Sequence, residues 1–313
     1  MPDITAAYGR ALIELAEQNS DVIVLDADVA DSCQTDAFAK KFPQRSFDLG
    51  VAEQSLPTFS AGLALCGKIP FYNCFAPFAV ARSFDMIRQT LCYMRANVKI
   101  AGHCAGQSMG YTGPTHHTIE DIGALRTLPN MVILNPCDAE EAKQMTFAAA
   151  AHNGPVYLRL VRMDVPAVHG PDYRFVIGKA DCLRRGRDIS LFVTGDLAAK
   201  CLALAETVEK QHGISVQVVN VPTLKPLMPQ EIVQYGEQTR AAITIEDHNV
   251  IGGLGSLVCE IYSENLSKPV KRIGILDRFT ESAPCEDLRE KHGLSDAIIV
   301  NAILDLSVNK AAK

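Results

Sequence analysis

Two doubly wound α/β domains are the fold class that this 313-residue sequence predicts. Short apolar runs alternate with segments whose apolar residues recur at helical spacing, a pattern typical of buried parallel strands connected by helices. The alternation stops at 163–175, where two prolines and a glycine interrupt any helical period. Because the chain length also suits two domains, we predict a first domain over 1–162, a linker over 163–175 and a second domain over 176–313.

In the first domain, each predicted element follows from its apolar spacing. The opening helix places Ala7, Ala11 and Leu15 on one face, and Asp138 stands where the N-cap of the last helix is expected. The predicted helices cover 6–18, 54–66, 84–95, 119–126 and 138–151. The predicted strands cover 22–25, 46–49, 69–74, 98–101, 131–134 and 155–160.

The second domain repeats this alternation after the linker. Apolar runs predict its strands at 190–193, 215–219, 242–245 and 270–275. Helical spacing predicts its helices at 197–211, 229–235, 254–263 and 296–306. Both domains are therefore expected to contain open parallel sheets, which bind ligands beyond the carboxyl ends of their strands.

Composition excludes several classes of partner. The net charge is −6 at pH 7 and no Lys/Arg-rich run occurs, so we predict no nucleic-acid surface. No apolar stretch approaches the ~20 residues that span a bilayer, so we predict no membrane contact. The segment from Met1 to Glu17 lacks the basic start and long apolar core of a signal peptide, so none is expected.

Ten cysteines are scattered along the chain without CxxC spacing. This usage predicts free thiols in a reducing compartment, hence a cytoplasmic protein, and it disfavours a disulfide framework. Metal-ligating residues also lack the close spacing of a zinc site, so we predict no metal site within this chain.

Polar and aromatic side chains follow the predicted strands of the first domain, at the points where these strands end. Because the carboxyl ends of parallel strands meet at one edge of a sheet, a binding site is expected there. The candidate residues, in chain order, are Asp28, Ser32, Glu53, Phe75, Phe78, His103, His116, His117 and Arg162.

Glu53 is the most informative of these candidates. It follows Gly50 at the junction between an extended segment and an apolar helical run. A carboxylate there lies at the end of a buried layer, where it can take part in acid–base chemistry. The alternative is a glutamate that simply favours the positive end of the helix dipole.

The longest predicted loop, Gly102 to Thr118, contains the adjacent residues His116 and His117. Long irregular loops in compact domains are usually functional or mobile, and adjacent histidines can donate to oxygen atoms or move protons. The alternative is that one histidine caps the next helix and the other is solvated. For Phe75 and Phe78, the alternative to a stacking platform is packing in the core.

Motifs in a fixed order give the chain a resemblance to a known family. Gly-Val-Ala-Glu-Gln (50–54), Phe-Ala-Pro-Phe (75–78) and Gly-Pro-Thr-His-His (113–117) are followed by Glu-Asp-His-Asn (246–249) and Phe-Thr-Glu-Ser (279–282). In this order they resemble the C-terminal half of the thiamine-diphosphate-dependent transketolase family. The resemblance implies a thiamine diphosphate pyrimidine-binding domain followed by a transketolase C-terminal domain.

The family's diphosphate-binding domain has no counterpart in this chain, which lacks the Gly-Asp-Gly motif. In the family this motif helps to hold the diphosphate and a divalent cation, which needs oxygen ligands. The resemblance therefore implies the C-terminal subunit of a heteromeric, split transketolase whose N-terminal partner subunit holds Mg²⁺ or a similar cation. We expect an α2β2 assembly, and the small residues of the predicted helix at 56–66 suit close contact between subunits.

By resemblance, the enzyme transfers a two-carbon ketol unit from a ketose to an aldose. Glu53 would hydrogen-bond N1′ of the cofactor's aminopyrimidine and, together with His116, would be catalytic. Phe75 and Phe78 would enclose the pyrimidine ring, and Asp28 would lie near the thiazolium. His116 would also contact sugar hydroxyls, and the remaining substrate-binding candidates are His103, His117, Ser32 and Arg162.

Two alternatives stay open. The β subunit of the first component (E1) of a 2-oxo-acid dehydrogenase shares the domain order and a similar Val-Ala-Glu-Gln, although the loop at 113–117 favours a transketolase. A non-catalytic paralogue would keep the fold without the activity. The sugar is undetermined, because Thr112 stands where some transketolases have an acid.

Overall fold

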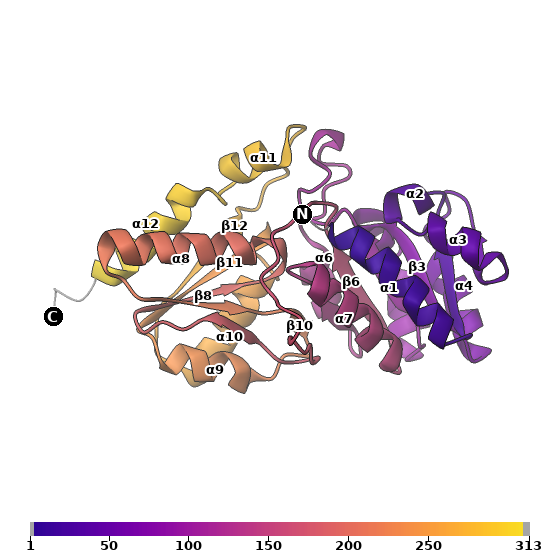
Figure 1. The fold of residues 1–313 in the computed structure, drawn as a ribbon, viewed down its shortest axis with the longest axis horizontal. Coiled ribbons are helices and arrows are strands. Elements are labelled where there is room, and N and C mark those ends of the chain that lie inside the picture. The colour runs from indigo at the N-terminus through magenta and orange to yellow at the C-terminus, as the bar shows by residue number, and fades with distance from the viewer. Residues whose placement is uncertain (1–2, 309–313) are drawn as a thin grey trace.

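A seven-stranded sheet organises the first part of the structure, a computed structural model that describes residues 3–308 (Figure 1). Its strand order is β10-β5-β6-β4-β3-β1-β2, and all neighbouring strands are parallel except β10, which runs antiparallel to β5 at the edge. The strands are β1 (Val22–Asp26), β2 (Ser46–Asp48), β3 (Ile69–Phe75), β4 (Lys99–His103), β5 (Val132–Leu134), β6 (Val156–Leu160) and β10 (Thr223–Lys225).

Helices cover both faces of this sheet. One face carries α1 (Ile4–Gln18), α3 (Asp36–Lys41) and α7 (Ala139–Ala151), whose apolar side chains form a common core with β1 and β6. The other face carries α4 (Ser55–Leu65), the helical stretch η2 (Phe78–Arg82), α5 (Phe84–Met86) and η3 (Ile87–Tyr93), and α6 (Asp121–Arg126). The short elements α2 (Ala30–Cys33), η1 (Pro43–Arg45) and η4 (Gly110–Thr112) lie in the connections.

A five-stranded sheet of order β12-β11-β8-β9-β7 organises the second part. It is parallel except for β7 at the edge. Its strands are β7 (Asp181–Arg184), β8 (Ile189–Val193), β9 (Val216–Asn220), β11 (Ala241–Asn249) and β12 (Val270–Ile275). In Figure 1, α8 (Ala198–His212) and α12 (Asp296–Val308) lie on one side of it, and α9 (Pro229–Glu237) and α10 (Leu254–Asn265) lie on the other. The turn η5 (Gly195–Leu197) follows β8, and α11 (Cys285–Lys291) precedes α12.

The prediction of an α/β fold with two wound domains is confirmed, and so is Asp138 as the N-cap of α7, where its carboxylate accepts from the N–H of Glu141. The predicted helix at 84–95 begins at Phe84 as expected, and the helical stretch η2 that precedes it was not predicted. The edge strands β7 and β10 were not predicted because they are short and mixed in polarity, without the apolar run of a central strand. Short helices α2, α3 and α11 were also missed.

The two sheets share one hydrophobic core. Its buried members include Ile122 and Leu125 of the first domain together with Leu224, Ile232 and Leu254 from β10, α9 and α10. The edge strand β10 extends the sheet of the first domain although it follows the linker in sequence. The domains are therefore packed together as a continuous apolar unit, and the exact boundaries at 162 and 175 stay a prediction.

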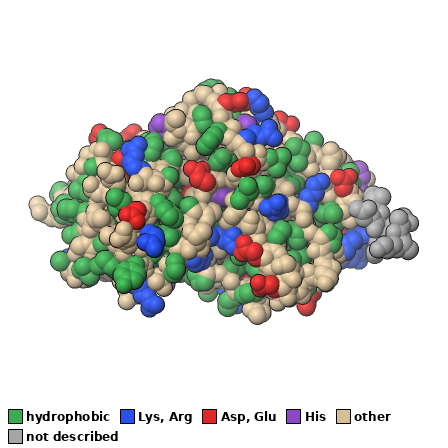
Figure 2. Space-filling model, turned by 180° about the vertical axis from the view of Figure 1, so that it is seen from behind, with side chains coloured by type: hydrophobic (Ala, Val, Ile, Leu, Met, Phe, Trp, Pro, Cys, Tyr) green, Lys and Arg blue, Asp and Glu red, His purple; other side chains and the backbone are tan. Residues whose placement is uncertain are grey.

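The surface carries charges of both signs (Figure 2), and the cysteines are unpaired. The face in Figure 2 carries acidic and basic side chains interspersed with apolar ones. Among the helices of residues 3–308, none has the length and apolar character needed to cross a bilayer. All ten cysteines are free thiols, as predicted, and most of them are buried.

Replacing Gly102 with alanine should destabilise the protein, because a Cβ at this position of β4 would lie 2.5 Å from Cε2 of Tyr157. The phenol is buried and donates its hydroxyl hydrogen to Asp121, so it has little room to move. We expect the free energy of unfolding to fall by about 1–3 kcal/mol in urea titrations. Gly170→Ala, where no heavy atom lies within 4 Å of the new Cβ, is the matched control. Equal losses in both variants would contradict this packing argument.

Candidate active site

The predicted site residues do gather at one edge of the first sheet. The strands that carry them lie side by side in the order β6-β4-β3-β1-β2. Arg162 follows β6, His103 ends β4, Phe75 ends β3, Asp28 follows β1, and Glu53 follows β2. The parallel arrangement therefore brings residues more than a hundred positions apart to a single rim.

Glu53 is a buried carboxylate at this rim, with 5% of its surface exposed. Its Oε2 accepts a hydrogen bond from Nη1 of Arg82 at 2.8 Å. Its backbone oxygen accepts from the hydroxyl of Ser83 at 3.1 Å, which ties the turn before α4 to the helical stretch that contains Arg82. Within residues 3–308, Arg82 is the sole hydrogen-bond partner of this carboxylate, so Oε1 remains available to a ligand.

An aromatic group adjoins Glu53. The guanidinium of Arg82 lies over the ring of Phe78, 4.7 Å from its centroid. The ring of His116 approaches Phe78 edge-on at 5.2 Å and Phe75 at 6.1 Å. Both phenylalanines are half-buried, so neither is wholly absorbed into the core. Glu53, Arg82, Phe75, Phe78 and His116 thus form one contiguous group.

Arg82 was missed by the sequence analysis. Its position four residues after Phe78 within a helical stretch is a usable signal, because side chains at that spacing share a face.

His103 lies beneath the rim and is fully buried. Its Nε2 bonds to Oδ1 of Asn73 at 3.1 Å, and the hydroxyl of Tyr8 donates to the same oxygen. Burial, assisted by the positive charge of Arg162, lowers the pKa of His103 to about 3. Its Nδ1 has no partner within the described residues. A substrate-binding role for His103 stays a prediction that depends on this nitrogen.

The other predicted rim residues are more open. Asp28 is exposed in a left-handed backbone conformation, and its N–H donates to Oδ1 of Asp48. Ser32 is half-buried in α2 and Arg162 is exposed. Burial raises the pKa of Cys33, the residue after Ser32, and the positive charge of Arg162 acts against this rise. Arg162 therefore lies near enough to affect both Cys33 and His103.

His117 makes hydrogen bonds within the chain through both of its ring nitrogens. It is buried, its Nε2 donates to the backbone oxygen of Gly110, and its Nδ1 accepts from the hydroxyl of Thr280 in the second domain. Burial lowers its pKa, in agreement with a neutral ring. Because both nitrogens are used inside the chain, this geometry does not support the prediction that His117 binds substrate.

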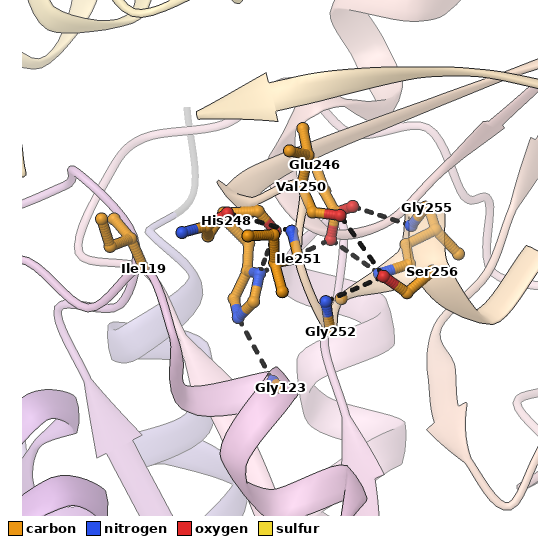
Figure 3. Close-up of polar contacts among 12 residues, drawn as sticks. Ile119, Gly123, Glu246, His248, Val250, Ile251, Gly252, Gly255 and Ser256 are labelled. Carbon is orange, nitrogen blue, oxygen red and sulfur yellow. Dashed lines mark hydrogen bonds and ion pairs between the residues drawn. The ribbon is translucent and has the colours of Figure 1, made fainter. Parts of the chain in front are cut away.

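Three consecutive side chains at the end of β11 are buried near the first domain, and two of them, Asp247 and His248, bond to it; Figure 3 shows Glu246 and His248. Glu246 accepts from the N–H groups of Leu254 and Gly255, both at 2.7 Å, and burial raises its pKa to about 7. His248 accepts at Nε2 from the N–H of Gly123 in α6 at 3.3 Å (Figure 3). The intervening Asp247 points towards the loop that carries His116.

A cluster of possible metal ligands lies at the junction between linker and domains. One ligand atom each from Cys137, Asp138 and His169 lies within 4.8 Å of the others, although the sequence spacing gave no sign of it. His169 bonds to Asp138 and Asp181, and these carboxylates raise its pKa to about 10 against the effect of burial. The carboxylates of Asp138 and Asp181 are thus paired with a protonated His169. Because Asp138 belongs to the first domain and Asp181 to the second, this histidine connects the two domains.

Two family models match the chain. The model for the transketolase pyrimidine binding domain matches residues 1–168, and the model for the transketolase C-terminal domain matches residues 178–299. The chain is 38% identical, over 95% of its length and 94% of the relative's, to a putative transketolase C-terminal section of Methanocaldococcus jannaschii. It is 35% identical to a 6-deoxy-6-sulfo-D-fructose transketolase subunit of a Clostridium species, over 97% of this chain and 94% of that one.

Solved structures give the same relationship. A split-gene transketolase, described as an inactive β4 tetramer, superposes with a TM-score of 0.91 at 43% identity, covering 97% of this chain and 98% of that chain. Transketolase from Campylobacter jejuni superposes with a TM-score of 0.81 at 24% identity, over 96% of this chain and 46% of the larger protein. The second likeness concerns the fold alone.

Replacing His103 with glutamine should weaken the pH dependence of stability. The folded pKa of about 3 lies below the ordinary 6.5, so the unfolded chain binds more protons between these values and stability falls as pH falls. The variant should lose stability less steeply between pH 6.5 and about pH 4, by up to about 1.4 kcal/mol per pH unit.

Urea unfolding of parent and variant across this pH window provides the measurement. The pKa of Asp26 and that of Glu246 are both raised by burial to about 7, and both act in the opposite direction. These contributions cancel in the comparison of variant with parent. Parallel pH curves would contradict the assignment of a buried, neutral His103.

Proposed function

The chain belongs to the transketolase family, and we propose that it is the C-terminal subunit of a split transketolase that transfers a two-carbon ketol unit from a ketose to an aldose. The observation that carries this proposal is the buried carboxylate of Glu53, which has a free oxygen next to the aromatic group of Phe78. The transketolase family depends on thiamine diphosphate, and this combination suits its aminopyrimidine ring. The relatives named as transketolase subunits support the same reaction class.

The residues present fit the pyrimidine end of that cofactor. Oε1 of Glu53 would bond to N1′ of the ring and hold a proton there, and Arg82 fixes the orientation of the carboxylate from the other oxygen. Phe75 and Phe78 offer partly open aromatic faces and edges for stacking. When bound, thiamine diphosphate supplies the electron sink that permits cleavage beside a carbonyl.

The substrate would lie between this group and the neighbouring strand ends. His116 presents a polar ring beside the phenylalanines, where it can bond to sugar hydroxyls or move a proton. Arg162 and Ser32, with His103 beneath them, form the side suited to an anionic group, such as a sugar phosphate. Asp28, exposed just beyond the end of β1, is the candidate contact to the thiazolium.

A partner subunit would complete the site. No Gly-Asp-Gly motif occurs in this sequence, so the ligands for the diphosphate and a divalent cation would come from a second, N-terminal type of subunit. The similar split-gene chain is described as inactive in its β4 form, which supports this division of labour. We propose an α2β2 complex in the cytoplasm.

Helix α4 is the proposed contact surface for that assembly. It follows Glu53 directly and carries apolar side chains on its outer as well as its inner side. Phe59 and Leu65 are 46% and 72% exposed, and Val51 just before the helix is 72% exposed. A helix that is apolar all round is normally buried, and a subunit interface beside the active site would bury this one.

Glu53→Gln should reduce turnover of the reconstituted two-subunit complex by at least about a hundredfold, because an amide cannot hold the proton at the ring nitrogen. Turnover is measured with a ketose and an aldose, and in parallel with a 2-oxo acid and an electron acceptor. Glu206→Gln, at an exposed position on α8, is the control that should keep full activity.

Three outcomes of that experiment would contradict the proposal. Unchanged turnover in Glu53→Gln would remove the assigned role of the carboxylate. Turnover of the 2-oxo acid alone would identify the chain as a dehydrogenase E1 β subunit. Inactivity of the parent complex with both substrate pairs would favour a non-catalytic paralogue.

The chain alone should self-associate without turnover, and addition of the partner subunit should produce a complex with two copies of each chain. Native mass spectrometry gives the stoichiometry, and the ketose assay gives the activity. Phe59→Glu on the exposed side of α4 should weaken assembly, because it places a charge in an apolar interface. A monomer in the presence of partner, or turnover by the chain alone, would contradict the split-enzyme assignment.

A further inference from the structure

The loop that carries His116 is bound by the second domain at several points. Oδ2 of Asp247, at the end of β11, accepts from the backbone N–H of Gln107 at 3.1 Å. The hydroxyl of Thr280 donates to His117, next to His116 in the chain. The hydroxyl of Ser282 donates to the backbone oxygen of Tyr111. The loop therefore has several of its partners in a domain that contributes no residue to the rim described above.

The backbone of the loop passes very close to these groups. A Cβ at Gly106, whose φ is +63°, would lie 2.6 Å from Oδ2 of Asp247. A Cβ at Gly110, whose φ is +49°, would lie 2.9 Å from the backbone oxygen of Ala283. Glycine is thus needed at both points for two reasons, the left-handed backbone and the close approach. The loop sequence is matched to the surface of the second domain.

The carboxylate that holds the loop is itself held. Oδ2 of Asp247 also accepts from Nη2 of Arg289 at 2.9 Å, and the same nitrogen donates to Asp196 at 2.7 Å. All three side chains are almost fully buried. Asp196 follows β8 and Asp247 lies at the end of β11, so Arg289 joins the carboxyl ends of two adjacent strands.

These strand ends form the topological switch point of the second sheet. Strand β9 lies on one side of β8, and β11 lies on the other. Open α/β sheets bind ligands in the crevice at that place. Here the guanidinium of Arg289 and the N–H of Gln107 lie at the ends of β8 and β11, where both bond to Asp247. The crevice that binds a ligand in other open sheets is therefore occupied by the loop that carries His116.

We propose that Asp247 and Thr280 of the second domain are positioning residues that hold His116 against Phe75 and Phe78 by clamping the loop at Gln107 and His117. The inference rests on the proposed function, because His116 is there assigned to the substrate. It gives the second domain a part in the reaction: it sets the distance from His116 to the reacting atoms. Small displacements of such a group cost about a hundredfold in rate.

Hydrogen–deuterium exchange of the loop, measured on the full chain without substrate, tests the clamp directly. Asp247→Ala removes the acceptor for Gln107. Thr280→Val removes the donor to His117 and keeps the side-chain shape, so it remains informative if the first variant does not fold. Both should speed exchange in residues 104–118 by about tenfold, as expected for loss of one hydrogen bond.

Asp196→Asn is the matched control. It weakens the same ion pair with Arg289 but removes no contact to the loop, so exchange in 104–118 should stay near that of the parent. Unchanged exchange in Thr280→Val and Asp247→Ala would overturn the proposal. Equal acceleration in Asp196→Asn would also overturn it, because the effect would then be general loosening of the buried charges.

A double-mutant cycle in the reconstituted complex tests whether the clamp acts through His116. Thr280→Val should lower kcat/KM for the ketose by about tenfold in the parent and leave it unchanged when His116 is already alanine. Thiamine diphosphate binding should stay within about twofold, because Glu53 and Phe78 lie outside the loop. Additive losses would overturn the coupling. The exchange experiment needs no turnover, so it decides the clamp even if the proposed reaction fails.

Discussion

One buried guanidinium, that of Arg159, holds the first sheet, the active-site loop and the second domain together. Its Nε donates to Asp121 at 2.8 Å, and its Nη2 donates to the backbone oxygens of Thr118 and Asp247. Burial would raise the pKa of Asp121, but the nearby positive charges, chiefly Arg159, bring it below the ordinary value. Charges removed from water in this way need fully matched partners, and loss of one partner typically costs about 3–5 kcal/mol.

The residues at the rim are held in place in two different ways. Glu53, Arg82 and the phenylalanines are fixed by the first sheet and its helices, through contacts near in sequence. His116 lies on an irregular loop, which could not hold a position by its own hydrogen bonds alone. The position of this loop depends on Arg159, which donates to the backbone oxygen of Thr118, and on the second domain, which bonds to Gln107 and His117. The candidate site residues thus belong to one domain, and the contacts that support them come from both.

The sequence revealed most of the fold because buried parallel strands appear as apolar runs, and strand ends then locate Glu53, Phe75 and His103 at one rim. It could not reveal Arg82 as the partner of Glu53 or Thr280 as the partner of His117, because these pairs form across 29 and 163 positions. It also could not reveal that His103 is fully buried, because this burial depends on Tyr8 and Asn73 packing around it. The spacing of apolar residues indicates helices and strands, whereas the surroundings of a side chain depend on contacts between segments far apart in the sequence.

Strand β10 has a consequence for any attempt to divide the chain. It lies beyond the linker in sequence, yet its backbone completes the outer row of hydrogen-bonding groups on β5. A fragment that ended at the linker would leave that row open, together with the apolar side chains that Leu224 covers. Unpaired strand edges recruit other chains, so such a fragment would polymerise or precipitate rather than behave as an autonomous module.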